Sequence, residues 1–146
     1  MLLGNGRVPL TLRDARTACP PGPARMRCLL VDDNAACLER ERALLARQGV
    51  TVVGTAASTA DALRQATALR PDVAVVDIGL GDESGFDLAV HLSEADVAVI
   101  MVSAAPAADY ADLLDESPAA GFLPKTELSA AGIGRILSRA SGRQER

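Results

Sequence analysis

The 146-residue chain has very few aromatic residues and a single lysine. Aromatic side chains make up 2% of the sequence, tryptophan is missing, and Lys125 is the only lysine beside fourteen arginines. Because apolar residues still make up 49%, the core must be built mainly from Ala, Val, Leu and Ile. One lysine among so many arginines is a matter of chance unless other residues give its ammonium group a specific partner.

The chain also lacks a positive net charge, and this bears on the kind of partner it can bind. The net charge is −4, so the sequence has no basic footprint of the kind that binds nucleic acid. Residues 1–27 hold five arginines against one aspartate, which leaves the rest of the chain more acidic than the whole. An acidic domain suits a bound cation or a basic partner better than DNA.

Long hydrophobic runs and paired cysteines are missing as well. No segment approaches the roughly 18 consecutive apolar residues of a membrane span. The N-terminus lacks the apolar stretch of a secretory signal. The three cysteines, Cys19, Cys28 and Cys37, form no CxxC pair, and their odd number argues against a disulfide framework. We interpret Cys28 and Cys37 as small buried hydrophobic residues and predict a cytoplasmic protein.

One segment of the chain, residues 26–140, is predicted to fold as a single domain. Residues 1–25 hold four of the eight prolines and sustain no helical or strand periodicity. We therefore predict a disordered extension there, and a start codon assigned upstream of a true start at Met26 is a simple explanation for it. Residues 141–146 are expected to form a short tail.

Within this domain, apolar strand patterns alternate with helical ones. The predicted strands cover residues 27–31, 50–56, 72–76, 97–102 and 119–123, and the predicted helices cover 35–48, 58–69, 86–94, 107–115 and 127–139. Residues 79–85 are expected to form a loop. Several strands are continuous aliphatic runs, as expected when helices cover both faces of a parallel sheet. The sequence therefore predicts a doubly wound α/β fold of (βα)5 order with a five-stranded parallel sheet.

Polar residues stand where four of these strands end. They are Asp32 and Asp33, Asp77, Ser103 and Lys125. The carboxyl ends of parallel strands meet at one rim, where open α/β sheets bind their ligands. Helix capping is the structural alternative for the first two aspartates. Three carboxylates placed together would repel one another unless a cation joins them, and Mg²⁺ prefers such oxygen ligands. We therefore predict a Mg²⁺ site.

The hydroxyl and the ammonium at the same rim suggest what the site binds besides a metal ion. A Ser at a strand end is usually a turn former, and a Lys there is usually solvated. Opposite a metal-bound carboxylate, however, Ser103 and Lys125 are suited to hold the oxygens of a phosphoryl group. A carboxylate can itself be the nucleophile that forms an aspartyl-phosphate.

In these positions the chain resembles the receiver domain of two-component response regulators, over about residues 26–140. The motifs that carry the resemblance are Val31-Asp32-Asp33-Asn34, Asp77 with Gly85 eight residues later, Ser103-Ala104, and Phe122-Leu123-Pro124-Lys125. Each motif alone is weak, but their order and their places at strand ends make the set specific. The resemblance implies the flavodoxin-like receiver fold.

The resemblance also implies roles for the residues that bind metal and phosphate. Asp77 would be the phosphoacceptor, and it would also contact Mg²⁺. Asp33 would bind the ion directly, Asp32 would bind it through water, and the backbone carbonyl of Gly79 would be a further ligand. Lys125 would pair with the acidic cluster and then with the phosphoryl group.

Two residues would couple the site to a surface. By resemblance, Ser103 is the hydroxyl that moves to the phosphate, and Phe122 is the aromatic side chain that changes rotamer with it. For Phe122, ordinary core packing is the interpretation without the resemblance. Residues 104–123 would form the surface that these two residues control, for a protein partner or for self-association.

The implied function is that of a single-domain response regulator rather than a metabolic enzyme. Its phosphoryl donor would be a sensor histidine kinase, a phosphotransfer protein or a small phosphodonor, and its output partner is unspecified. We expect no DNA-binding domain and no membrane contact. The oligomeric state is expected to be a monomer or a phosphorylation-dependent dimer. The loop of residues 79–85 departs from the Met-Pro pattern of many receivers and is expected to be more mobile, and Thr126 follows Lys125 where a proline is frequent.

Three other interpretations compete with this one. A dinucleotide-binding domain would need a glycine-rich turn where this chain has Asp32 and Asp33. A phosphohydrolase with an Asp nucleophile usually has a second acid two residues further on, where this chain has Gly79. The serious alternative is a degenerate receiver that is never phosphorylated and acts as an interaction module, although it would not need all five polar positions.

Overall fold

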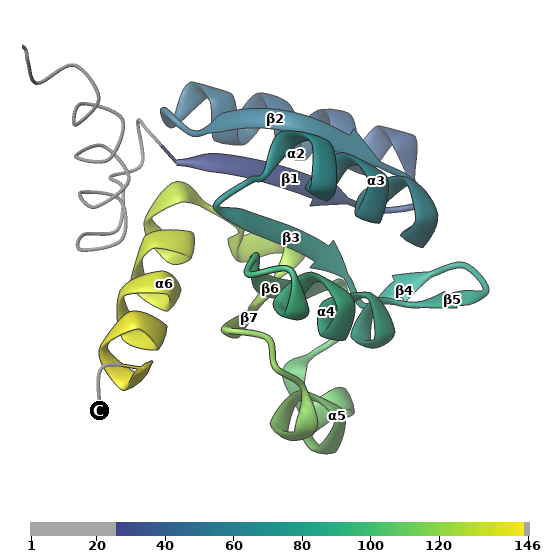
Figure 1. Ribbon diagram of the computed structural model, residues 1–146, viewed down its shortest axis with the longest axis vertical. Coiled ribbons are helices and arrows are strands. Elements are labelled where there is room, and N and C mark those ends of the chain that lie inside the picture. The colour runs from purple at the N-terminus through teal and green to yellow at the C-terminus, as the bar shows by residue number, and fades with distance from the viewer. Residues whose placement is uncertain (1–25, 145–146) are drawn as a thin grey trace, which may run out of the picture.

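The computed structural model describes residues 26–144, and side chains as far as residue 140. A five-stranded parallel sheet forms its centre, with the strand order β2-β1-β3-β6-β7 (Figure 1). The strands are β1 (Arg27–Val31), β2 (Thr51–Ala56), β3 (Val73–Asp77), β6 (Ala98–Ser103) and β7 (Gly121–Pro124). The predicted doubly wound sheet is therefore confirmed, with β3 at its centre.

Helices cover both faces of the sheet. The α-helices are α2 (Ala35–Arg47), α3 (Thr59–Leu69), α4 (Gly85–Glu94), α5 (Ala111–Glu116) and α6 (Ala130–Gln144), and two 3-10 segments are η2 (Ala107–Tyr110) and η3 (Lys125–Glu127). Helices α2 and α6 pack on one face, and α3 and α4 pack on the other. Among the described residues, no helix is long and apolar enough to cross a membrane.

The core consists of two apolar layers, one on each side of the sheet. Successive residues of β1 point to opposite layers, with Cys28 and Leu30 in the α2/α6 layer and Leu29 and Val31 in the α3/α4 layer. All four are at most 2% exposed. No aromatic side chain is among the fully buried residues of the described chain, as the composition leads one to expect. The continuous aliphatic strands follow from burial on both faces.

Short polar side chains begin the helices that follow β1 and β2. The Asn34 side chain accepts a hydrogen bond from the backbone N–H of Cys37 at 3.0 Å and begins α2. The Ser58 hydroxyl accepts one from the N–H of Asp61 at 3.2 Å and begins α3. Such caps satisfy backbone donors that the first helical turn leaves free. Each helix therefore starts directly beyond the carboxyl end of a strand.

The segment of residues 79–85 differs most from its prediction. Instead of an irregular loop, Gly79–Leu80 (β4) and Glu83–Ser84 (β5) pair as a two-stranded antiparallel hairpin. Figure 1 shows this hairpin beyond the carboxyl ends of β1, β2 and β3. The Ser84 hydroxyl caps α4, so that helix already starts at Gly85. Two strands of two residues each give no period in a sequence, which is why the pairing was not predicted.

Other boundaries differ by a few residues. Strands β3 and β6 include Asp77 and Ser103, whereas both residues were placed just past a strand. The predicted helix over residues 107–115 is divided into η2 and α5, and the last helix begins at Ala130 rather than residue 127. Cys28 is buried as expected, but Cys37 is partly exposed and is not a core residue. Cys19, and with it the predicted extension over residues 1–25, lies outside the described residues.

Candidate functional site

The sheet order brings the carboxyl ends of four strands to one rim. Strand β3 lies between β1 and β6, and β6 pairs in turn with β7. In this register Asp77 is opposite Val102, and Ser103 is opposite Pro124, which directly precedes Lys125. Asp32 follows β1 and donates its backbone N–H to the carbonyl of Ala56 at 3.0 Å.

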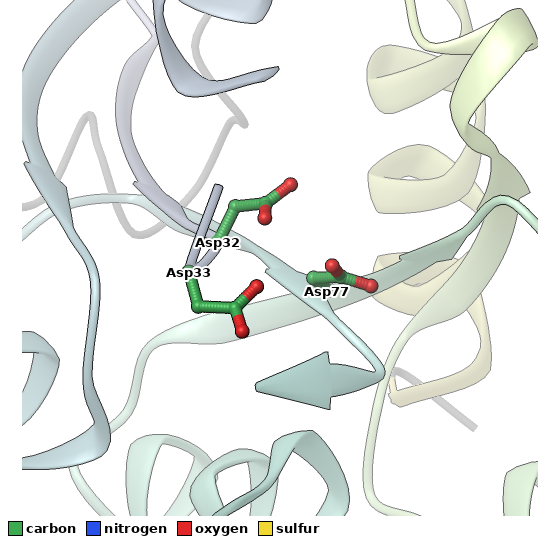
Figure 2. Close-up of side chains that lie close together, drawn as sticks. All are labelled: Asp32, Asp33 and Asp77. Carbon is green, nitrogen blue, oxygen red and sulfur yellow. The ribbon is translucent and has the colours of Figure 1, made fainter. Parts of the chain in front are cut away.

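Three carboxylates meet at this rim. One oxygen each of Asp32, Asp33 and Asp77 lies within 4.8 Å of the other two (Figure 2). Asp32 is 1% exposed and Asp77 is 9% exposed, whereas Asp33 is open to solvent. Asn34 caps the following helix, so helix capping does not account for the two neighbouring aspartates. The predicted cluster therefore exists, with one of its carboxylates facing water.

The single lysine lies against this cluster. The Nζ atom of Lys125 is 2.7 Å from Oδ2 of Asp32 and 3.1 Å from Oδ2 of Asp77. Burial by itself lowers the pKa of this ammonium, but its hydrogen bonds to Asp32 and Asp77 outweigh burial and raise the pKa well above the usual range. Lys125 is therefore a permanent cation that joins the ends of β1, β3 and β7.

Opposing influences act on the pKa of Asp77. Burial is the largest and raises its pKa, the hydrogen bond and charge of Lys125 lower it, and the charge of Asp32 raises it again, so that the net shift is upward. The backbone N–H of Gly79 also donates to Oδ1 of Asp77 at 3.3 Å. One ammonium thus leaves part of the negative charge of the cluster uncompensated.

Helix α2 contributes a fourth carboxyl group that the sequence analysis missed. Glu41 is 9% exposed and shares the buried face of α2 with Leu38 and Leu45. Burial, followed by the charge of Asp32, raises its pKa from 4.5 to about 7. The signal in the sequence is a glutamate three residues after one apolar position and four before another, where the helical pattern calls for an apolar side chain.

The two predicted switch residues lie on neighbouring strands, Ser103 at the end of β6 and Phe122 in β7. Ser103 is 5% exposed, and its Oγ accepts a hydrogen bond from the backbone N–H of Ala105 at 3.0 Å. Phe122 lies opposite Met101 in the sheet and packs, partly buried, against the α3/α4 layer. Tyr110 packs against the same layer, with its ring centroid 6.4 Å from that of Phe86. The structure therefore brings the hydroxyl to the rim and the aromatic ring to an edge of the core.

The donor set fits a hard divalent cation. All three converging ligands are carboxylate oxygens, which Mg²⁺ prefers, and no sulfur or imidazole ligand is among them. Lys125 takes Oδ2 of both Asp32 and Asp77, and Oδ1 of Asp32 accepts the N–H of Asn34 at 2.9 Å. Asp33 remains free and exposed, so an ion that keeps several waters can approach from the solvent side.

Comparison with known proteins agrees with this geometry. The family model of the response regulator receiver domain matches residues 28–135 of the chain. The chain belongs to the response regulator receiver domain family. That family consists of signalling domains rather than metabolic enzymes, its members generally bind Mg²⁺ at an acidic pocket, and they interact with histidine kinases or phosphotransfer proteins. The predicted resemblance is confirmed by this match.

Curated relatives and solved structures of receivers are similar to the chain. The sensory transduction protein LytT of Enterococcus faecalis is 38% identical over 87 residues, which are 59% of this chain and 36% of LytT. A transcriptional regulator of Pseudomonas aeruginosa is 34% identical over 101 residues, which are 68% of this chain and 49% of the regulator. The matched part of the receiver thus spans half or less of these relatives. The solved receiver domain of the response regulator NarL from Mycobacterium tuberculosis has a TM-score of 0.64 and 31% identity, covering 84% of this chain and 99% of that domain.

Proposed function

We propose that this receiver accepts a phosphoryl group on Asp77, in the presence of Mg²⁺, and thereby changes a protein-binding surface. The observation that carries the proposal is the position of Asp77, which lies 3.1 Å from the Lys125 ammonium and beside the carboxylates of Asp32 and Asp33. A phosphoryl group on Asp77 would place its oxygens among these charges. An interaction module that is never phosphorylated has no use for such a cluster.

In the transfer step, a carboxylate oxygen of Asp77 attacks the phosphorus of the donor. With a phosphohistidine donor, the new oxygen–phosphorus bond forms as the phosphorus–nitrogen bond breaks. The electron pair stays on the imidazole nitrogen, which takes a proton from solvent. The raised pKa of Asp77 corresponds to a more basic and therefore more nucleophilic carboxylate once it is ionised.

Two kinds of positive charge assist this step. Asp33, Asp77, the carbonyl of Gly79 and, through water, Asp32 would hold Mg²⁺, which when bound neutralises charge on the phosphoryl oxygens. Lys125 already points its ammonium at Asp77 and can donate a hydrogen bond to a phosphoryl oxygen. The contact between Lys125 and Asp32 keeps this cation at the rim before the donor arrives.

The phosphoryl group would be sensed by Ser103 and Phe122. Before phosphorylation, the Ser103 hydroxyl accepts the Ala105 N–H, and we infer that it turns to donate to the phosphoryl oxygens afterwards. The segment from Ala104 to Gly121 connects Ser103 with the strand of Phe122, and it contains Tyr110 and the exposed Leu113. A shift at the rim can therefore change this surface through a two-state equilibrium.

The proposed reaction requires a phosphoryl donor and an output partner. A sensor histidine kinase, a phosphotransfer protein or a small phosphodonor would supply the phosphoryl group in the cytoplasm. The output would be an unidentified protein bound at the surface of residues 104–123, or a second copy of the chain in a phosphorylation-dependent dimer. We propose that output occurs through this surface.

Phosphorylation with a small donor tests the proposal. The protein is incubated with acetyl phosphate and Mg²⁺, and its intact mass is measured. We expect an adduct of about 80 Da, one phosphoryl group, on the wild type and on Asp82→Asn, but not on Asp77→Asn. Asp82 is the matched control because it is an exposed aspartate of the adjoining hairpin outside the cluster. A wild type without an adduct, or an Asp77→Asn variant with one, would overturn the proposal.

A further inference from the structure

The β4–β5 hairpin is attached to the rest of the protein at both strands. Leu80, in β4, is 3% exposed and belongs to the α3/α4 layer of the core. Glu83, the partner of Leu80 in β5, has an exposed side chain that reaches out of the hairpin. Its Oε1 accepts a hydrogen bond from the backbone N–H of Thr59 at 2.7 Å. One side of the hairpin is therefore held by burial, and the other by the contact between Glu83 and Thr59.

Glu83 makes this contact at the first turn of α3. Ser58 caps that helix by accepting the N–H of Asp61, which leaves the N–H of Thr59 without a helical partner. A carboxylate is favoured at this end because the helix dipole is positive there. Hydrogen bonds from the backbone and the side chain of Thr59 lower the pKa of Glu83. The contact thus joins two segments, 24 residues apart, that follow different strands of the sheet.

The turn of the hairpin lies beside the exposed carboxylate of Asp33, at the edge of the acidic cluster. Gly81, between the two short strands, has a φ of 63°, and a Cβ atom placed on it would be 3.3 Å from Oδ2 of Asp33. At the base of the hairpin, the Gly79 N–H donates to Asp77. Figure 1 shows the hairpin at the end of β3, and Asp77 is the last residue of that strand. The hairpin therefore borders the cluster on the side of Asp33 and Asp77.

We propose that Glu83 is a positioning residue that holds the β4–β5 hairpin against α3, and that this contact sets how long a phosphoryl group stays on Asp77. The proposal rests on the proposed function of Asp77. With the contact made, the turn at Gly81 stays beside the carboxylate of Asp33, whose outer side is open to solvent, and the Gly79 backbone stays beside Asp77. With the contact broken, Leu80 still anchors β4, but the turn can lift and admit water to the acyl phosphate.

Four variants separate this contact from the charge of Glu83. Glu83→Ala removes the acceptor, whereas Glu83→Gln keeps an acceptor oxygen and removes only the charge. Asp82→Ala removes a charge from the same turn without touching the contact. Thr59→Pro removes the donor from the other side. Proline is favoured at the first helical position, and Ser58 already has the extended conformation that precedes proline (φ −146°, ψ 162°).

The first readout is hydrogen exchange of the amides of residues 79–84 in the unphosphorylated protein. We expect Glu83→Ala and Thr59→Pro to speed exchange there by roughly threefold to tenfold, the effect of losing one hydrogen bond. Asp82→Ala should exchange like the wild type, and Glu83→Gln should lie close to it. Equal exchange in all five proteins would overturn the proposal, because the contact would not be holding the hairpin.

The second readout is the half-life of the phosphoryl group, followed by intact mass after removal of acetyl phosphate. The half-life should fall by roughly twofold or more in Glu83→Ala and Thr59→Pro. The double variant should be no worse than either single one, because both changes break the same contact. Glu83→Gln should restore most of the half-life. A merely structural role would leave the half-life unchanged at equal thermal stability, and that result would overturn the proposal.

The two proposals can fail separately. If the wild type takes up no phosphoryl group, the function proposed for Asp77 is wrong, and with it the role of Glu83 in phosphoryl lifetime. If the wild type is phosphorylated but Glu83→Ala and Asp82→Ala lose the group at the same rate as the wild type, only the role of Glu83 is wrong. A shorter half-life in Glu83→Ala without faster exchange in the hairpin would also contradict the mechanism.

Discussion

The Nζ atom of Lys125 lies 3.1 Å from Oδ2 of Asp77 and, at the same time, 2.7 Å from Oδ2 of Asp32. Asp77 ends β3, Asp32 follows the neighbouring strand β1, and Lys125 follows the edge strand β7, so this ammonium connects distant parts of the chain. A compact ammonium fits between two carboxylates, whereas the planar guanidinium group of arginine needs more room. This geometry accounts for one lysine in a chain whose other cations are arginines.

Lys125→Arg should therefore keep the fold but impair phosphorylation. The guanidinium group can pair with Asp32. It cannot also take the place of the ammonium beside Asp77 without displacing one of the two carboxylates. We expect the circular dichroism spectrum to be unchanged and the initial rate of phosphorylation by acetyl phosphate to fall by roughly tenfold. Arg64→Lys is the control, because it makes the reverse exchange in an exposed ion pair on α3. A wild-type rate and phosphoryl half-life in Lys125→Arg would mean that the lysine is not specifically required.

Glu41 should make stability depend on pH between 4.5 and about 7. Burial, together with the charge of Asp32, raises its pKa from 4.5 to about 7, so the folded state binds a proton more tightly than the unfolded state. The free energy of unfolding should therefore rise as the pH falls through 7 towards 4.5. The cost of burying the ionised Glu41 carboxylate is fully present above pH 7, where this group is ionised in both the folded and the unfolded state.

Glu41→Gln isolates this effect from the other carboxyl groups. Urea unfolding at several pH values should show that the variant is more stable than the wild type at pH 8, and that the difference shrinks towards pH 5. Glu39→Gln, on the exposed face of the same helix, should not show this trend, because Arg42 lowers the pKa of Glu39. A difference between wild type and Glu41→Gln that is constant over this pH range would contradict the assignment.

Asp33→Asn should abolish the stabilisation by Mg²⁺ without destabilising the apo protein. In the absence of divalent ions, Asp33→Asn relieves repulsion among three carboxylates, so the apo protein should be unchanged or slightly more stable. A bound ion stabilises the folded state by mass action, by about 1.4 kcal/mol at an ion concentration ten times the dissociation constant. The rise in thermal midpoint on adding Mg²⁺ should therefore be lost in Asp33→Asn and kept in Asp82→Asn. An undiminished rise in Asp33→Asn would exclude it as a ligand.

Gly85 should be required because α4 starts against the strand that carries Asp77. A Cβ atom on Gly85 would lie 2.4 Å from the backbone oxygen of Asp77 and 3.0 Å from Cα of Ile78. Gly85→Ala should cost about 1–3 kcal/mol of unfolding free energy and slow phosphorylation, because backbone atoms must move. Gly134→Ala, in α6, meets no atom within 4 Å and should stabilise by roughly 0.5–1 kcal/mol. A neutral Gly85→Ala would show that the start of α4 can shift freely.

Much of the fold could be predicted because burial determines which positions of the sequence are apolar. The run of residues 97–102 is aliphatic throughout because β6 is covered on both faces, and helix α3 was bounded by its cap at Ser58 and by Pro71. The site could be predicted for the same reason, since in parallel strands the residues at the carboxyl ends of neighbours must meet. Asp32, Asp77 and Lys125 were predicted to share one rim because each stands at the carboxyl end of a predicted parallel strand, although β6 lies between β3 and β7 in the sheet.

What the sequence did not reveal depends on contacts between segments that have no shared pattern. The β4–β5 hairpin has two residues per strand, and its hold on α3 depends on one side chain, Glu83, and one backbone donor at Thr59. Glu41 was missed because a charged residue in a helix suggests an exposed face, whereas it is the packing of α2 that buries this carboxyl group. Cys37 was placed in the core, although it lies on the partly exposed side of the same helix.

The central claim is that Asp77 carries the phosphoryl group, and mapping the modified residue tests it most directly. Wild-type protein treated with acetyl phosphate and Mg²⁺ is reduced with borohydride, which converts an acyl phosphate into an alcohol, and its peptides are then sequenced by mass spectrometry. We predict homoserine at position 77 and unmodified aspartate at positions 32, 33 and 82. Homoserine at one of those other positions, or at none, would contradict the account.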